Sequence, residues 1–125
     1  MESVNTQSFV ESLKPTHGAV EQMADDMWSV GPHIVGYDPS RCFLTVYAVH
    51  DFPLSDQEDD IIVSVLEHMN RYPATKTVIM NGYLVISHET FTSTTDNFDH
   101  RFTLIEMALF QAYNGLLKLI GVAPE

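Results

Sequence analysis

The dipeptide Asn81-Gly82 constrains the fold most, because it stands between two short apolar runs, residues 77–80 and 83–87. A two-residue turn of type I′ needs φ > 0 at both central residues, and Asn and Gly tolerate this conformation best. Strands joined by so short a turn must pair antiparallel. The pattern therefore predicts a β-hairpin whose second strand extends as far as Phe91. A turn of two residues leaves little room for a recognition loop, so we interpret the hairpin as structural.

The longest periodic pattern is helical and spans residues 96–120. Apolar residues recur at intervals of three or four, which is the spacing of one helix face: Phe98, Phe102, Ile105, Leu109, Ala112, Leu116 and Ile120. We expect Thr95 or Asp96 to cap this helix and Gly121 to end it. The opposite face is expected to be polar and carries Asp99, Thr103, Glu106, Gln111, Asn114 and Lys118.

The apolar stripe of this helix is wider than one core face requires. Five further residues flank it: Leu104, Met107, Phe110, Tyr113 and Leu117. Deep burial explains such a width, and so does a second interface. We predict a homodimer from it, with these five residues as candidate interface residues.

Weaker patterns predict a short helix at 4–13, hairpin strands at 20–24 and 27–30, a strand at 42–50 and an acidic, capped helix at 55–70. The unbroken apolar character of 42–50 indicates a central strand covered on both faces, or one covered by a partner. This order of elements predicts an α+β fold. We expect an antiparallel sheet with helices packed on one face and a long C-terminal helix, in a single domain at 1–125.

The charge of the chain restricts its partners. The formal net charge is −11, and the six Lys and Arg residues are scattered along the sequence. Binding to phosphates depends on clustered cations, so we expect neither a nucleic-acid partner nor an anionic membrane partner. The single cysteine and the absence of a signal-like or membrane-spanning apolar run lead us to expect a cytoplasmic protein.

Six histidines raise the question of a metal site: His17, His33, His50, His68, His88 and His100. The paired spacings typical of zinc ligands do not occur. Four of the six stand beside a carboxylate, but neighbours in sequence point in different directions. We interpret them as surface histidines and predict no metal ion, although joint sensing of pH by these residues stays open.

Other candidate sites are weaker still. Cys42 is either a nucleophile or a buried structural thiol at the start of a strand, and we favour the second. The acidic run 56–60 is either a cation or basic-partner site, or a solvated first helical turn that complements the helix dipole, which we favour. Five aromatic residues are either a recognition surface or, more commonly, half-buried sheet positions: Trp28, Tyr37, Tyr47, Tyr72 and Tyr83.

Catalytic motifs such as a nucleophile elbow or a phosphate-binding loop do not occur in the sequence. We therefore predict that the protein is not an enzyme and has no cofactor. The leading hypothesis is a module that binds a protein or peptide partner. The alternative is a small-molecule or metal-sensing domain that uses the histidines.

The order of several motifs is familiar. The strand FLTVYAVHD leads into Phe52-Pro53-Leu54, an acidic helix ends in LEHMNRYP, and KTVIMNGYLVISHET and TSTTDNFDH precede the final helix. From Cys42 to Ile120 the chain resembles the YbjN family, particularly its actinobacterial members, which are described as bacterial sensory transduction regulators. Asn70 stands where the family often has Asn, whereas Met69 replaces the Trp that often precedes it, and the N-terminal third matches only loosely.

That family is grouped by fold with the type III secretion chaperones. The resemblance therefore implies a chaperone-like α+β fold, dimerisation and a protein-binding or regulatory role. It implies no catalytic residues.

Overall fold

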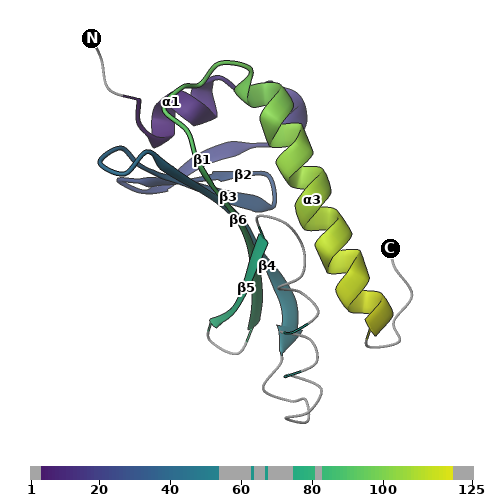
Figure 1. Cartoon of the computed structure of the whole chain (residues 1–125). Helices are drawn as coiled ribbons and strands as arrows, with labels where there is room; N and C mark the ends of the chain where they lie inside the picture. Colours follow the sequence, from purple (N-terminus) through teal and green to yellow (C-terminus); the bar gives the residue numbers. More distant parts are fainter. Residues whose placement is uncertain (1–3, 54–62, 64–66, 68–74, 81–82, 120–125) are drawn as a thin grey trace.

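The computed structural model describes residues 4–53, 63, 67, 75–80 and 83–119 of the chain. Its elements are α1 (Thr6–Glu11), the 3-10 turn η1 (Pro15–His17), β1 (Val20–Ala24), β2 (Met27–Val30), β3 (His33–Asp38), β4 (Phe43–Pro53), β5 (Thr75–Met80), β6 (Tyr83–Phe91) and α3 (Phe98–Leu119). The six strands form one sheet in the order β1-β2-β3-β4-β6-β5, and every neighbouring pair is antiparallel. The predicted α+β fold is confirmed (Figure 1).

The register agrees with the hairpin pattern in the sequence. Met80 pairs with Tyr83, so two residues separate β5 from β6. The turn itself, Asn81-Gly82, lies outside the described residues. The predicted helix at 55–70 also lies outside them, except for Val63 and Glu67, which are both helical.

The core lies on one face of the sheet, beneath α1 and α3. Phe9 of α1, Val35 of β3, Ile86 of β6 and Phe102 of α3 are fully buried members of one cluster. Figure 1 shows α3 running along one side of the curved sheet. The predicted apolar stripe of α3 is buried from Phe98 to Leu116, which confirms this helix face.

The other face of β4 differs from the expectation of cover on both sides. Leu44, Val46 and Ala48 point into the core, whereas Val49 on the opposite face is half-exposed. No helix in the described ranges packs on that opposite face. The strand is therefore central in the sheet but is covered on one face only, within the part of the chain that the structure describes.

Helix α3 begins at Phe98, two residues beyond the predicted cap Asp96. The residue before it, Asn97, has a φ of 57°, a left-handed conformation that Asn tolerates better than most residues. Arg101 secures this connection, because its guanidinium donates to the carbonyl oxygens of Thr94 at 2.7 Å and Asp96 at 3.2 Å.

Candidate binding groove and its histidine network

Two glycines bring η1 against the turn between β2 and β3. Gly18 has a φ of 119° and Gly31 a φ of 58°. A Cβ on Gly31 would lie 2.6 Å from the carbonyl oxygen of His17, and one on Gly18 would lie 2.7 Å from the Cα of Gly31. Only residues without a side chain permit this approach. It places His17 and His33 on the same side of α3.

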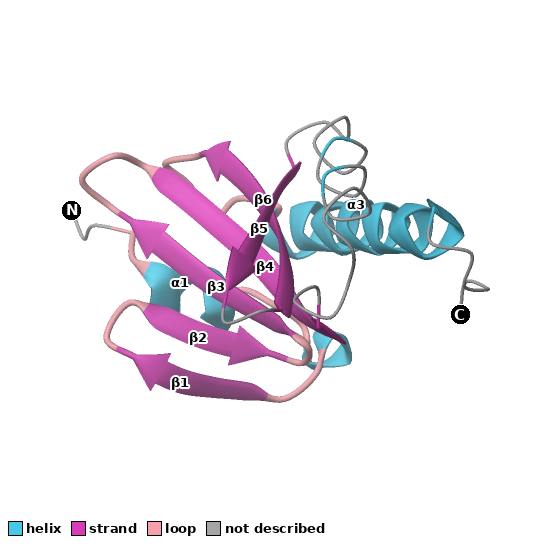
Figure 2. Ribbon diagram, turned by 90° about the horizontal axis from the view of Figure 1, so that it is seen from below, coloured by secondary structure: helices cyan, strands magenta, loops and turns pink. Residues whose placement is uncertain are grey.

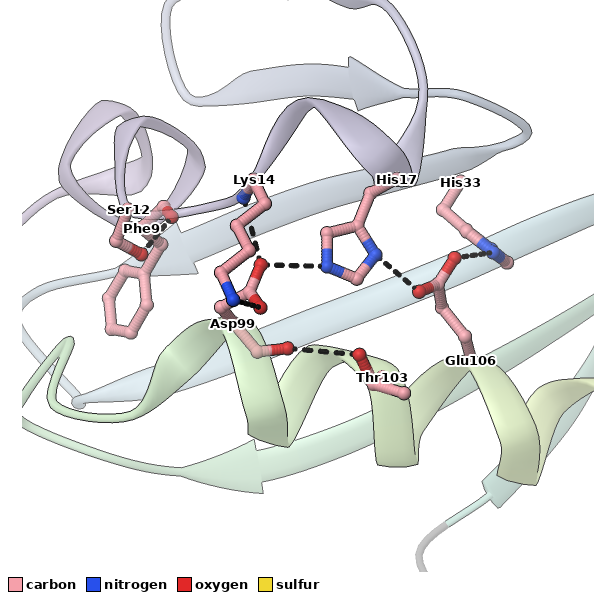
Figure 3. A network of polar contacts seen from close by, with 8 residues as sticks. All are labelled: Phe9, Ser12, Lys14, His17, His33, Asp99, Thr103 and Glu106. Atoms are coloured by element: carbon pink, nitrogen blue, oxygen red, sulfur yellow. Dashed lines mark hydrogen bonds and ion pairs between the residues drawn. The ribbon is translucent and has the colours of Figure 1, made fainter.

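The partners of these histidines, Asp99 and Glu106, belong to one line of residues along α3. Asp99, Thr103, Glu106, Phe110 and Tyr113 are spaced by three or four, so they form a single stripe. The sequence assigned Asp99, Thr103 and Glu106 to the polar, outer face of the helix. That assignment is wrong for Asp99 and Glu106, which contact the N-terminal segment (Figure 3).

The His17 ring lies between two carboxylates. Its Nδ1 is 2.6 Å from Oε1 of Glu106, and its Nε2 is 2.8 Å from Oδ1 of Asp99. The side chain is only 8% exposed. The His17 ring therefore joins the two carboxylates of α3 through its two nitrogens.

Asp99 has a second partner in the same network. The backbone N–H of Lys14 donates to its Oδ1 at 2.8 Å. This hydrogen bond is the main reason why the pKa of Asp99 is lower than usual, and His17 adds to the effect. Asp99 therefore stays ionised beside the histidine ring.

His33 occupies the other side of Glu106. Its Nε2 lies 3.3 Å from Oε2 of that carboxylate. Burial lowers the pKa of His33, the Glu106 carboxylate opposes this effect, and the nearby His17 lowers the pKa further. Both histidine rings stand edge to face with Phe102, at centroid distances of 4.9 Å and 5.8 Å. The Nδ1 of His33 is buried and has no hydrogen-bond partner among the described residues.

The interpretation of the histidines as surface residues is wrong for most of those described. His17 and His33 are buried, and His50 stacks on Tyr113 with ring centroids 3.7 Å apart and planes 4° apart. His88 is half-buried, and burial lowers its pKa. His100 alone is exposed as expected, and His68 lies outside the described residues. Within the described ranges, no three His, Cys, Asp or Glu residues are arranged to hold a metal ion.

A groove continues from this network along α3. Its volume is about 510 Å³, and its walls come from the β2–β3 turn, β3, β4 and α3. The lining is mainly apolar: Pro32, His33, Ala48, His50, Thr103, Glu106, Met107, Leu109, Phe110 and Tyr113. The polar atoms that it presents come from the two histidines, Glu106, Thr103 and Tyr113. A volume of this order is typical of ligand-binding sites.

Three of the five candidate interface residues line this groove: Met107, Phe110 and Tyr113. Met107 and Phe110 are 52% and 56% exposed, and Leu104, one turn away, is 51% exposed. Leu117 is buried. The opposite wall, formed by His33 and His50, had no signal in the sequence because it belongs to strands far from α3.

The other candidates are placed as follows. Cys42 is not a buried strand residue, since it is half-buried in the turn before β4 and has a φ of 51°. Trp28 and Tyr47 are half-buried sheet residues as predicted, Tyr37 is fully buried, and Tyr83 is exposed. Tyr72 and the acidic run 56–60 lie outside the described residues.

No protein-family model matches this chain, and no curated protein is significantly similar to it. The resemblance to the YbjN family therefore stays a prediction. None of the helices in the described ranges has the combination of length and apolarity that crossing a bilayer requires.

Proposed function

We propose that the chain is a non-enzymatic binding module that takes an apolar peptide segment of a partner protein into the groove beside α3. One observation carries this proposal: the groove is open and apolar, and Met107 and Phe110 at its edge are half-exposed. Clustered apolar exposure of this kind is typical of interaction sites. Grooves beside helices are a common docking surface for peptides.

The charge of the protein bears on the partner. The chain carries a net charge of −11, and Glu106 lies in the groove wall. An acidic surface attracts cationic segments and repels acidic ones. We therefore expect the bound peptide to combine apolar anchors with flanking Lys or Arg residues.

The lining of the groove supports binding rather than covalent chemistry. Its described residues include no Ser or Cys, and the Thr103 hydroxyl donates to the backbone carbonyl of Asp99 at 3.2 Å. Apart from the Tyr113 phenol, the described lining therefore offers the His33–Glu106 pair neither a thiol nor a free aliphatic hydroxyl as a nucleophile.

A small-molecule sensor is the second candidate, and the buried Nδ1 of His33 favours it. That atom lacks a hydrogen-bond partner among the described residues, and His33 lines the groove. When Nε2 donates to Glu106, Nδ1 is the acceptor of a neutral ring. A small ligand with one N–H or O–H group and an apolar body would suit this arrangement.

We further propose that the protein is a chaperone-like or regulatory homodimer that works in a reducing compartment such as the cytoplasm. The YbjN resemblance, the single free Cys42 and the exposed apolar residues support this proposal.

Peptide selection tests the groove directly. A random peptide library displayed on phage would be panned on the immobilised protein, and selected peptides would be measured by fluorescence anisotropy. We expect enrichment of apolar residues with adjacent Lys or Arg. Met107→Asp should weaken binding at least about tenfold, or about 1.4 kcal/mol.

Met23→Asp is the matched control, because Met23 is exposed to the same degree on β1, away from the groove. It should bind the selected peptides like the wild type. Equal weakening by both variants, or no enrichment at all, would contradict the proposed groove. If no peptide binds but a fragment library shifts the NMR signals of Met107 and His33, the small-molecule reading replaces it.

A further inference from the structure

A second apolar surface lies on the side of the sheet that faces away from α1 and α3. We call it the outer sheet face and define it by six residues of β4, β5 and β6: Phe43, Tyr47, Val49, Val78, Tyr83 and Phe91. The strand register places Phe43 directly opposite Phe91, with ring centroids 5.2 Å apart. An antiparallel sheet with one solvated face usually alternates apolar and polar residues. In β4 and β6, the residues that point away from the core are largely apolar, as are those that point into it.

Several large apolar side chains of this face are exposed, although Val85, between Val49 and Val78, is only 3% exposed. Phe91 is 74% exposed, Val49 49% and Tyr83 40%. The described helices pack on the opposite face, and Figure 2 shows α1 behind β2 and β3. Exposure of several large apolar side chains on neighbouring strands is unfavourable in water, so a partner surface would stabilise it.

The shape and the charge of the outer sheet face indicate which kind of partner can bind to it. Two shallow hollows of about 450 Å³ and 220 Å³ lie along it and share Thr45. Their charged residues include both signs: Asp26, Asp38, Glu89, Arg41 and Lys76. Three acidic and two basic residues give a nearly balanced surface, whereas the whole chain carries −11.

This balance favours a second copy of the chain. Two strongly acidic molecules repel one another, so they approach with least cost through a surface that carries both signs. In a two-fold interface each contact occurs twice, with a residue of one copy meeting a different residue of the other. Arg41 and Asp38 already pair with each other at 2.9 Å within one copy, whereas Lys76 of one copy can pair with Glu89 of the other.

We propose that the outer sheet face is the surface through which two copies of this chain form a homodimer. The sheets pack face to face at about 10 Å, as sheets in sandwiches do. This inference specifies the surface of the homodimer proposed above, and it does not depend on the peptide groove. It leaves Met107 and Phe110 free, so each copy keeps an open groove beside α3.

Sedimentation velocity and light scattering over a wide concentration range test this surface. The wild type should have the mass of a dimer. Phe91→Glu should raise the dimer dissociation constant at least about thirtyfold, because a charge enters the interface twice. Val49→Lys should act in the same direction, and it decides the question if circular dichroism shows that Phe91→Glu is unfolded.

Phe110→Glu is the matched control, since Phe110 is also an exposed phenylalanine but lies on α3. It should remain dimeric. A wild type that is monomeric throughout overturns the proposal, and so does a dimer that Phe110→Glu dissociates while Phe91→Glu and Val49→Lys do not. Peptide binding by Phe91→Glu separates the two proposals, because the groove should still bind when the dimer is lost.

Discussion

His17 and Glu106 are 89 positions apart in the chain, yet Nδ1 of His17 lies 2.6 Å from Oε1 of Glu106. Glu106 also contacts His33 through its other oxygen, at 3.3 Å. One carboxylate of α3 thus joins η1 to β3. The contact ties the N-terminal segment to the helix that forms the groove, so its loss should affect the whole fold.

We expect His17→Ala to lower the free energy of unfolding by about 1–3 kcal/mol, because it leaves two part-buried carboxylates without their shared hydrogen-bond partner. His100→Ala is the control, since His100 is exposed on the same helix as Glu106, and its effect should stay below about 0.5 kcal/mol. Urea denaturation at pH 7 measures both. Equal stability of the two variants would show that the network does not stabilise the fold.

Gly31→Ala should destabilise by about 1–3 kcal/mol, because the backbone has a left-handed conformation there and the added Cβ meets the His17 carbonyl. Gly36→Ala is the matched control. Its Cβ would lie 3.5 Å from the Asp26 carbonyl, an ordinary contact, so its effect should be below about 1 kcal/mol. Thermal unfolding compares them, and the larger loss in Gly36→Ala would contradict this explanation.

Thr6→Val should cost about 1–3 kcal/mol although the two side chains have similar shapes. The Thr6 hydroxyl accepts from the backbone N–H of Tyr37 at 3.0 Å and donates to the Asp26 carbonyl at 3.0 Å. Valine leaves the buried N–H of Tyr37 unpaired. Thr103→Val serves as the exposed control and should change stability by less than about 0.5 kcal/mol. Hydrogen exchange at Tyr37 provides a local readout, and unchanged protection there would be evidence against this role.

Acidification should destabilise the protein through His88. Burial lowers its pKa below the ordinary value of 6.5, so below that pH the unfolded chain binds a proton that the folded chain excludes. Stability should therefore fall as the pH decreases from 6.5 towards the folded-state pKa, and above 6.5 this effect is absent. His88 pairs across the sheet with Val46 and Thr75, which carry no charge. Burial therefore has the largest effect on the pKa of His88.

His88→Leu isolates this effect, because leucine suits a half-buried position on the core face of β6 and does not titrate. Denaturation should be measured at several pH values between about 5 and 7, on both sides of the ordinary histidine pKa. The free energy of unfolding should depend less on pH in the variant than in the wild type. His33 should retain its own contribution in both, since burial lowers its pKa as well. Parallel profiles would rule out a role for His88 in the pH dependence.

Much of the fold followed from local patterns. The spacing of Phe98, Phe102 and Ile105 identified the face of α3 that is buried, because 3.6 residues per turn brings such positions together in any helix. The two short runs around Asn81-Gly82 likewise identified β5 and β6 as antiparallel neighbours. These predictions depend on residues within a few positions of one another.

The local pattern failed for Asp99 and Glu106. Both lie opposite the apolar stripe and read as solvent-facing residues, yet they contact His17. Gly18 and Gly31 make this possible, but a glycine in a sequence does not say which segment will approach it. Asp99 and Glu106 are two turns apart on one face of α3, and this spacing was the one feature of the sequence that indicated a shared contact. It does not identify His17 as the residue that they contact.

The sequence by itself determined the long C-terminal helix, the β5–β6 hairpin and the antiparallel α+β class, because a local period of apolar residues is specific to a helix or a strand. It did not predict strand β3. Only the tertiary structure decided which histidines are buried, that Glu106 joins His17 to His33, and that β3, β4 and α3 enclose a groove. Those features are contacts between residues that are distant in the chain. They arise when separate elements pack closely, and no period in the sequence records which side chains then meet.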